Sequence, residues 1–138
     1  MAVLTLLAEV QQNVLLDYPG ARQTVQQIQT FVNDSSPPAV RIEVSLALAK
    51  TLWVQGEFAD CFQHTQALKS NSSDSISQKE FPMHMAAMEN AHVLSTLLHE
   101  GPAAARTAAL SLDVVGLPAP AQAAQCLNIG VVEALCGL

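Results

Sequence analysis

Aromatic side chains are scarce in this sequence of 138 residues. They make up 4% of the chain although half of all residues are hydrophobic, so the apolar content is mostly Ala, Leu and Val. A β-sheet favours β-branched and aromatic residues, whereas small and unbranched apolar side chains suit closely packed helices. The composition therefore predicts an all-α protein. Its length suits a single domain over residues 1–138, with a core of its own.

Positive charge is also scarce. Six Lys and Arg stand against twelve Asp and Glu, for a formal net charge of −6. Nucleic acids and anionic lipid headgroups are bound by clustered cations, but the basic residues here are scattered singly along the chain. We therefore expect an acidic, soluble protein that binds no nucleic acid. We expect its partners to be one or more proteins. Peripheral attachment to a membrane complex remains possible on this composition.

Long hydrophobic runs are absent. No segment approaches the roughly 20 apolar residues of a membrane-spanning helix, and the most apolar region, residues 119–138, is interrupted by Gln122, Gln125, Asn128 and Glu133. The apolar start of the chain lacks the basic flank of a signal peptide and runs directly into Glu9, so we interpret it as an amphipathic helix. The compartment stays open, with a cytoplasmic or organelle interior favoured.

Cysteine is limited to three residues, an odd number. Cys126 and Cys136 lie ten residues apart, which is about 15 Å on one continuous helix and too far for a disulfide. We expect Cys61, Cys126 and Cys136 to be reduced thiols that fill small positions in the core.

Seven helices are predicted by apolar residues at three- and four-residue steps and by breaks rich in Gly, Pro and Ser. In the first, we expect Leu4, Leu7, Val10, Val14 and Leu15 to form the inner face. The break at residues 17–20 is expected to separate it from the second. The predicted segments are 4–16, 21–33, 38–55, 57–68, a fifth from 77 or 82 to 99, 103–115 and about 119–138.

The helices are expected to pair. Short turns at Gly20, Gly56 and Gly101 are 36 and 45 residues apart, a spacing typical of stacked helical hairpins. The central pair resembles the tetratricopeptide-repeat family over Ile42–Leu68, with Ser45 and Thr65 where that family has aromatics. The resemblance rests on Leu48, Ala49, Leu52, Gly56, Phe58 and Cys61. It implies a short α-solenoid of three antiparallel hairpins and a terminal helix, whose concave face binds a peptide or another subunit.

Residues that suggest chemistry do not form a complete site. His84, His92 and His99 share one side of the fifth predicted helix, but successive rings would be roughly 10–12 Å apart along its axis, too far to chelate one ion. Glu89 and His92 have the spacing of half a di-iron site, and the chain has no second such pair. We therefore expect no metal and no cofactor.

Cys61 and His64 lie one helical turn apart, as a nucleophile and its base could. A reactive thiol needs an electropositive setting, whereas Asp60 and Glu57 would raise the pKa of this one. Burial of Cys61 explains it better, and we expect no enzymatic activity.

The last predicted helix is apolar on more than one side, although terminal helices of such stacks usually have a polar outer face. It either inserts into the core or docks on another protein. Trp53 is a further candidate anchor, with ordinary packing as its alternative. The candidate partner-binding residues are Trp53, Leu127, Val131, Val132, Leu135 and Leu138.

These features favour a non-catalytic protein-interaction or scaffold subunit of a larger assembly, which binds through a groove between helices and through the apolar last helix. The alternative is a small helical bundle that holds an apolar ligand or pigment, with His92 or His99 as a contact. A stoichiometric protein partner would favour the first hypothesis, and a bound chromophore or lipid the second.

Overall fold

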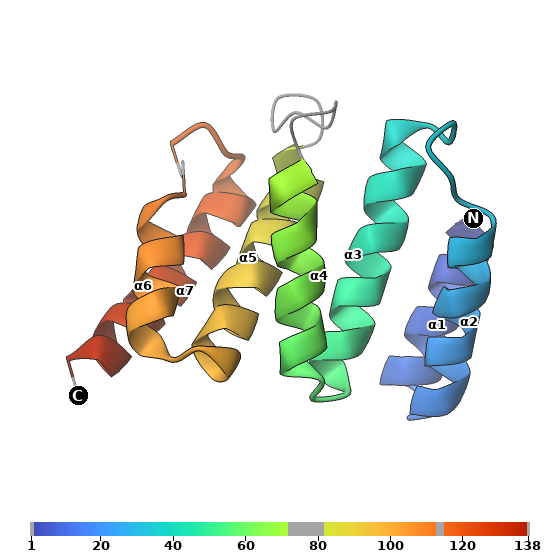
Figure 1. Ribbon diagram of the computed structural model, residues 1–138, viewed down its shortest axis with the longest axis horizontal. Helices are drawn as coiled ribbons and strands as arrows, with labels where there is room; N and C mark the ends of the chain where they lie inside the picture. The colour runs from blue at the N-terminus through green and yellow to red at the C-terminus, as the bar shows by residue number, and fades with distance from the viewer. Residues whose placement is uncertain (1, 72–81, 113–114, 138) are drawn as a thin grey trace. The chain divides into compact units, whose positions relative to one another are not determined.

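The computed structural model describes residues 2–71, 82–112 and 115–137 (Figure 1). These residues form seven α-helices and contain no β-strand, which confirms the predicted all-α fold. The contacts divide the chain into two compact units, residues 1–57 and residues 58–138, and each unit is described by itself. That residues 1–138 act as one domain stays a prediction.

The first unit contains α1 (Ala2–Asn13), α2 (Tyr18–Thr30) and α3 (Pro38–Val54). Helices α1 and α2 lie side by side as an antiparallel pair, and α3 packs mainly on α2 and to a smaller extent on α1 (Figure 1). The third helix thus has two neighbours within this unit.

The start of α2 corrects the predicted break at residues 17–20. Asp17 caps the helix, because its Oδ1 accepts a hydrogen bond from the Gly20 N–H at 3.0 Å, and Pro19 occupies the first turn, where its fixed φ suits a helix. The chain instead breaks after Asn13, and Leu16 adopts a left-handed φ of 55°. The first helix therefore ends three residues earlier than predicted and begins two residues earlier, at Ala2.

The orientation of α1 was also predicted wrongly. Its buried residues are Thr5, Ala8 and Gln12, whereas Leu7, Val10, Val14 and Leu15 are exposed. The contact with α2 uses small and polar side chains: Ala21 and Thr24 of α2 are buried, and the Thr24 hydroxyl donates to Gln11 Oε1 at 2.7 Å. Small residues allow two helices to approach closely, and here they outweigh the larger apolar stripe.

Helix α3 ends in the turn predicted at Gly56. The Gly56 N–H donates to the Trp53 carbonyl at 3.0 Å and the Glu57 N–H to the Leu52 carbonyl at 2.9 Å, which together form a Schellman motif. Gly56 has φ 77°, which favours glycine at this position. Arg22 of α2 pairs with Glu57 and so connects this turn to α2.

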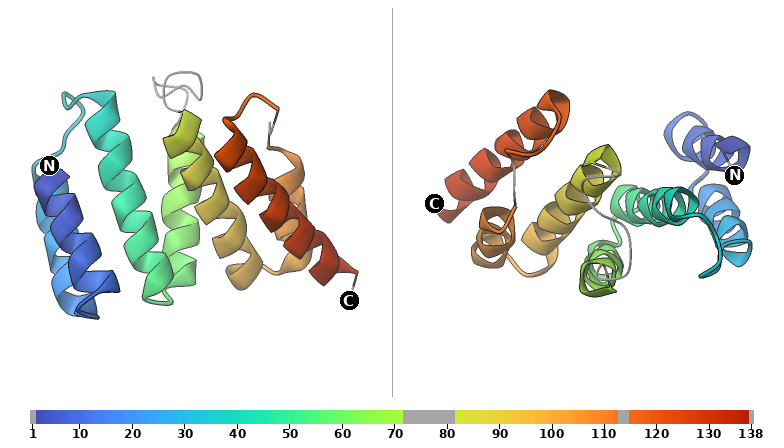
Figure 2. Two further views of the ribbon diagram at one scale, coloured as in Figure 1. Left: turned by 180° about the vertical axis from the view of Figure 1, so that it is seen from behind. Right: turned by 90° about the horizontal axis from the view of Figure 1, so that it is seen from above.

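The second unit contains α4 (Phe58–Asn71), α5 (Pro82–His99), α6 (Pro102–Leu110) and α7 (Ala119–Cys136). Consecutive helices run antiparallel, and α7 packs on both α5 and α6 (Figure 2). The core is built largely from small side chains, which let the helices approach closely. Among the described residues it includes a cluster of Val93, Ala105, Ala109 and Val132 and a cluster of Ala86, Leu117 and Ala121.

Several predicted helix ends in this unit need correction. Helix α6 ends at Leu110 instead of residue 115, because the Ser111 hydroxyl donates to the Ala108 carbonyl and the next backbone N–H groups bond three residues back. Helix α4 continues to Asn71, beyond the predicted end at residue 68. The predicted polar loop at residues 70–77 and the alternative start of α5 at Ser77 lie largely outside the described residues, within which α5 begins at Pro82.

No helix in the described part of the chain is both long and apolar enough to cross a membrane.

Candidate functional site

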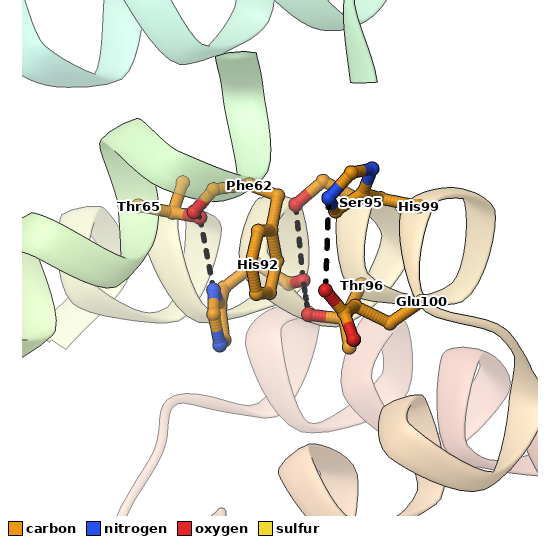
Figure 3. Close-up of polar contacts among 7 residues, drawn as sticks. All are labelled: Phe62, Thr65, His92, Ser95, Thr96, His99 and Glu100. Carbon is orange, nitrogen blue, oxygen red and sulfur yellow. Dashed lines mark hydrogen bonds and ion pairs between the residues drawn. The ribbon is translucent and has the colours of Figure 1, made fainter. Parts of the chain in front are cut away.

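The contact between α4 and α5 contains a buried polar cluster (Figure 3). Thr65 of α4 and His92 of α5 meet there, with the Thr65 hydroxyl 2.9 Å from His92 Nδ1. The same hydroxyl bonds back to the Cys61 and Phe62 carbonyls of its own helix at 3.0 and 3.1 Å. When the hydroxyl donates its proton to a carbonyl, His92 Nδ1–H donates to the hydroxyl oxygen, which places the imidazole proton on Nδ1.

Phe62 lies between two histidine rings. It stacks on His92, with ring centroids 5.6 Å apart, and is tilted against His99, with centroids 5.1 Å apart. His99 Nε2 is also 3.6 Å from a carboxylate oxygen of Glu100. Figure 3 shows these side chains together with the Ser95 and Thr96 hydroxyls, which both donate to the His92 carbonyl.

Cys61 adjoins this cluster and is fully buried, as predicted. Burial raises the pKa of its thiol above the ordinary value, and a hydrogen bond with the Ser95 side chain opposes part of that shift. A thiol held in its neutral form is a poor nucleophile. His92 is only 7% exposed, so a substrate could reach its imidazole only if α4 and α5 separated. The cluster is therefore suited to fixing how these two helices pack.

The pairing of Thr65 with His92 was not predicted from the sequence. The signal was present: Thr65 stands where the resembling family has an aromatic, and a polar side chain on an inner stripe requires a polar partner. His92 was considered only as a metal ligand or as a contact for a bound apolar ligand. Within the described ranges, no group of three or more His, Cys, Asp or Glu residues could hold a metal ion.

A second candidate site is the outward surface of α7, which we call the α7 outer face. On the inward side of α7, Ala121, Gln125 and Val132 are buried. The opposite side is apolar and uncharged, and Glu133, the one charged residue of α7, lies at its edge in an ion pair with Arg106 at 2.7 Å. The α7 outer face consists of the exposed residues Ala123, Leu127, Gly130, Val131, Ala134 and Leu135.

The structure separates the predicted partner-binding residues. Leu127, Val131 and Leu135 lie together on the α7 outer face, Val132 is fully buried in the core, and Leu138 is outside the described residues. Val132 is therefore removed from the candidate surface, because a partner cannot contact it there. Trp53 is half-buried on α3 in the first unit, and its role as an anchor stays a prediction.

Cys126 and Cys136 correct another expectation. Both are free and exposed, whereas the sequence predicted burial for all three thiols. Cys126 lies outside the inward side of α7, where Ala121, Gln125 and Val132 are buried, whereas Cys136 is the last residue of the helix.

Sequence reasoning missed a third surface, which we call the α1 outer face. It consists of Val3, Leu6, Leu7, Val10 and Val14, all exposed. The apolar periodicity was recognised, but its direction was predicted wrongly, since an amphipathic pattern does not itself say whether the partner of the helix belongs to the same unit.

Comparison of the chain with models of protein families, with curated proteins and with solved structures finds no match.

Proposed function

We propose that this protein is a non-catalytic interaction or scaffold subunit of a larger assembly and that it binds a protein partner through the α7 outer face. The proposal is supported chiefly by one observation: Leu127, Val131 and Leu135 form an exposed apolar surface without charge on one side of a single helix. Contiguous apolar surface of this kind is typical of protein-binding sites, since leaving it in water is unfavourable.

The small residues of this face suit a helical partner. Ala123, Gly130 and Ala134 present no side chain beyond Cβ, so a second helix can approach closely, while Leu127 and Val131 beside them supply apolar side chains that a partner can bury. Apart from its two chain neighbours and the nearby backbone of α7, no atom of the described residues lies within 4 Å of the position that a Cβ on Gly130 would take, which leaves this stretch open for a partner.

The experiment uses the full chain in the cells that express it, with two matched variants. Leu127 is 69% exposed on α7 and Leu110 is 66% exposed on α6, so Leu127→Lys and Leu110→Lys make the same change at equally exposed sites. A stoichiometric protein should copurify with the wild-type chain and with Leu110→Lys but be lost from Leu127→Lys, while both variants keep the wild-type helical content.

Equal retention of the partner by both variants would contradict the α7 outer face as the binding site. Copurification of a chromophore or lipid without a protein would instead support the alternative function, the binding of an apolar ligand between helices.

A further inference from the structure

The α1 outer face has the spacing of a helix-pairing seam. Val3, Leu7, Val10 and Val14 follow one another at steps of four, three and four residues, which is the a/d pattern of a coiled coil, and Leu6 flanks them. Val14 is the first residue after α1, and its N–H still bonds to the Val10 carbonyl at 3.0 Å, four residues back, as in a helix. The occupant that fits such a surface is another helix.

This face is the more hydrophobic side of α1, and it points outward. Val3 is 79% and Val14 70% exposed, while the buried side carries Thr5, Ala8 and Gln12. A surface helix normally buries its apolar stripe. The arrangement is therefore that of a helix whose second partner lies outside the unit.

The charges of α1 permit a second copy of the same helix as the partner. In paired helices, the e and g positions that flank the seam set partner choice through their charges. Here these positions hold Leu4, Leu6, Gln11 and Asn13, and the one charged residue of α1, Glu9, lies at a c position away from the seam. A copy of the same helix therefore meets no like charge across the seam, even though each chain carries a net charge of −6.

The seam is also self-complementary. In an antiparallel pair related by a two-fold axis, Val3 lies opposite Val14 of the second copy, and Leu7 lies opposite Val10 of the second copy. Each larger side chain thus meets a smaller one near the axis. The five exposed side chains offer on the order of 500 Å² per copy, so two copies would bury roughly 1,000 Å², the lower bound for a specific interface.

We infer that two copies of this protein pair through the α1 outer face, as an antiparallel α1–α1 contact. The contact is small, so the dimer is weak, with a dissociation constant on the order of micromolar or above. This inference is independent of the α7 outer face, which remains open to a different protein.

Sedimentation of the purified full chain between about 1 and 500 µM tests the pairing, with charge-pair rescue to establish where it occurs. Wild type should pass from monomer to dimer over this range. Leu7→Glu and Leu7→Lys should each remain monomeric, because each variant places two like charges close together beside the axis and opposite the apolar Val10, with a loss of affinity of about 100-fold. An equal mixture of the two variants should dimerise again, which an unfolded variant could not do.

Leu110→Glu on α6 is the matched control and should dimerise as wild type does. A wild-type chain that is monomeric throughout the range would overturn the inference. A dimer that survives Leu7→Glu would also overturn it. A dimer that is lost with Leu127→Glu but not with Leu7→Glu would assign self-association to the α7 outer face instead. Failure of the dimer leaves the test of the α7 partner unaffected, because that test detects a different protein.

Discussion

At the scale of single residues, the packing of α4 on α5 depends on polar groups that satisfy one another. Thr65 is 1% exposed and lies within hydrogen-bond distance of His92 Nδ1, which is itself buried. A buried polar atom that loses its partner costs more than the hydrogen bond contributed, because the atom has already been removed from water. The cluster therefore makes this contact specific as well as stable.

Thr65→Val should destabilise the second unit by about 1–3 kcal/mol, because it keeps the shape of the side chain and removes the hydroxyl beside His92 Nδ1. Chemical denaturation followed by circular dichroism measures the change. Thr65→Ser keeps the hydroxyl and should lose less. A Thr65→Val variant as stable as wild type would show that the hydrogen bond contributes nothing.

A substitution at Gln125 should stabilise the protein, in contrast to Thr65→Val. It is 2% exposed, and among the described residues its Oε1 has no hydrogen-bond partner. Gln125→Met keeps a similar volume without the buried carbonyl oxygen and should raise the free energy of unfolding by about 1 kcal/mol. Gln29→Met on the exposed side of α2 should change it little. Destabilisation by Gln125→Met would mean that this oxygen is satisfied in solution.

The cysteines should differ in reactivity and in their effect on stability. Cys126 and Cys136 should react quickly with a thiol reagent, and Cys61 only after unfolding. Burial raises the pKa of Cys61, so the folded state holds this proton more tightly than the unfolded state. The free energy of unfolding should thus fall as pH rises through the range in which an unfolded thiol ionises. Cys61→Ala should lack this slope, and an identical slope in the variant would contradict the assignment.

At the scale of elements, α7 has one face that packs in the core and another that is exposed to solvent. Val132 is fully buried with Val93, Ala105 and Ala109, whereas Leu127, five residues earlier, is mostly exposed. The first face holds the helix on α5 and α6, and the second is the proposed binding surface. Mutations on the two faces should therefore separate stability from binding.

Val132→Ala should cost about 1–3 kcal/mol of stability through the lost methyl groups and the cavity left behind. Leu127→Ala should change stability by less than about 0.5 kcal/mol, because the side chain is already in water. Thermal or chemical denaturation of the two variants in parallel gives both values. Equal losses would contradict the division of α7 into an inner and an outer face.

The sequence was sufficient to predict the number of helices and several of their starts, because Pro at a first turn and Gly in a left-handed turn are local signals. Pro38 and Pro102 lie in the first turns of α3 and α6, and Gly56 has a left-handed φ. The direction of the apolar stripe of α1 was not predictable in this way, since it depends on which neighbour α1 meets. The Thr65–His92 pair joins residues 27 positions apart and required the packing of α4 on α5 to be known.

At the scale of the whole molecule, the net charge of −6 opposes any contact between two copies. The proposed α1–α1 contact contains no charge across its seam, so salt should only screen this repulsion. The dissociation constant of the dimer should fall a few-fold between about 0.05 and 0.5 M NaCl, as measured by sedimentation. A dimer that dissociates when salt is added would indicate an interface held by ion pairs and would contradict the apolar seam.

The central claim, that this chain is an interaction subunit, is tested most directly by native mass spectrometry of the endogenous protein. The 14.7 kDa chain should be found in an assembly whose mass includes at least one different polypeptide. Multiples of the chain's own mass alone would support the α1 pairing but contradict the proposed partner. A bare chain, or one that carries only a small molecule, would contradict the central claim.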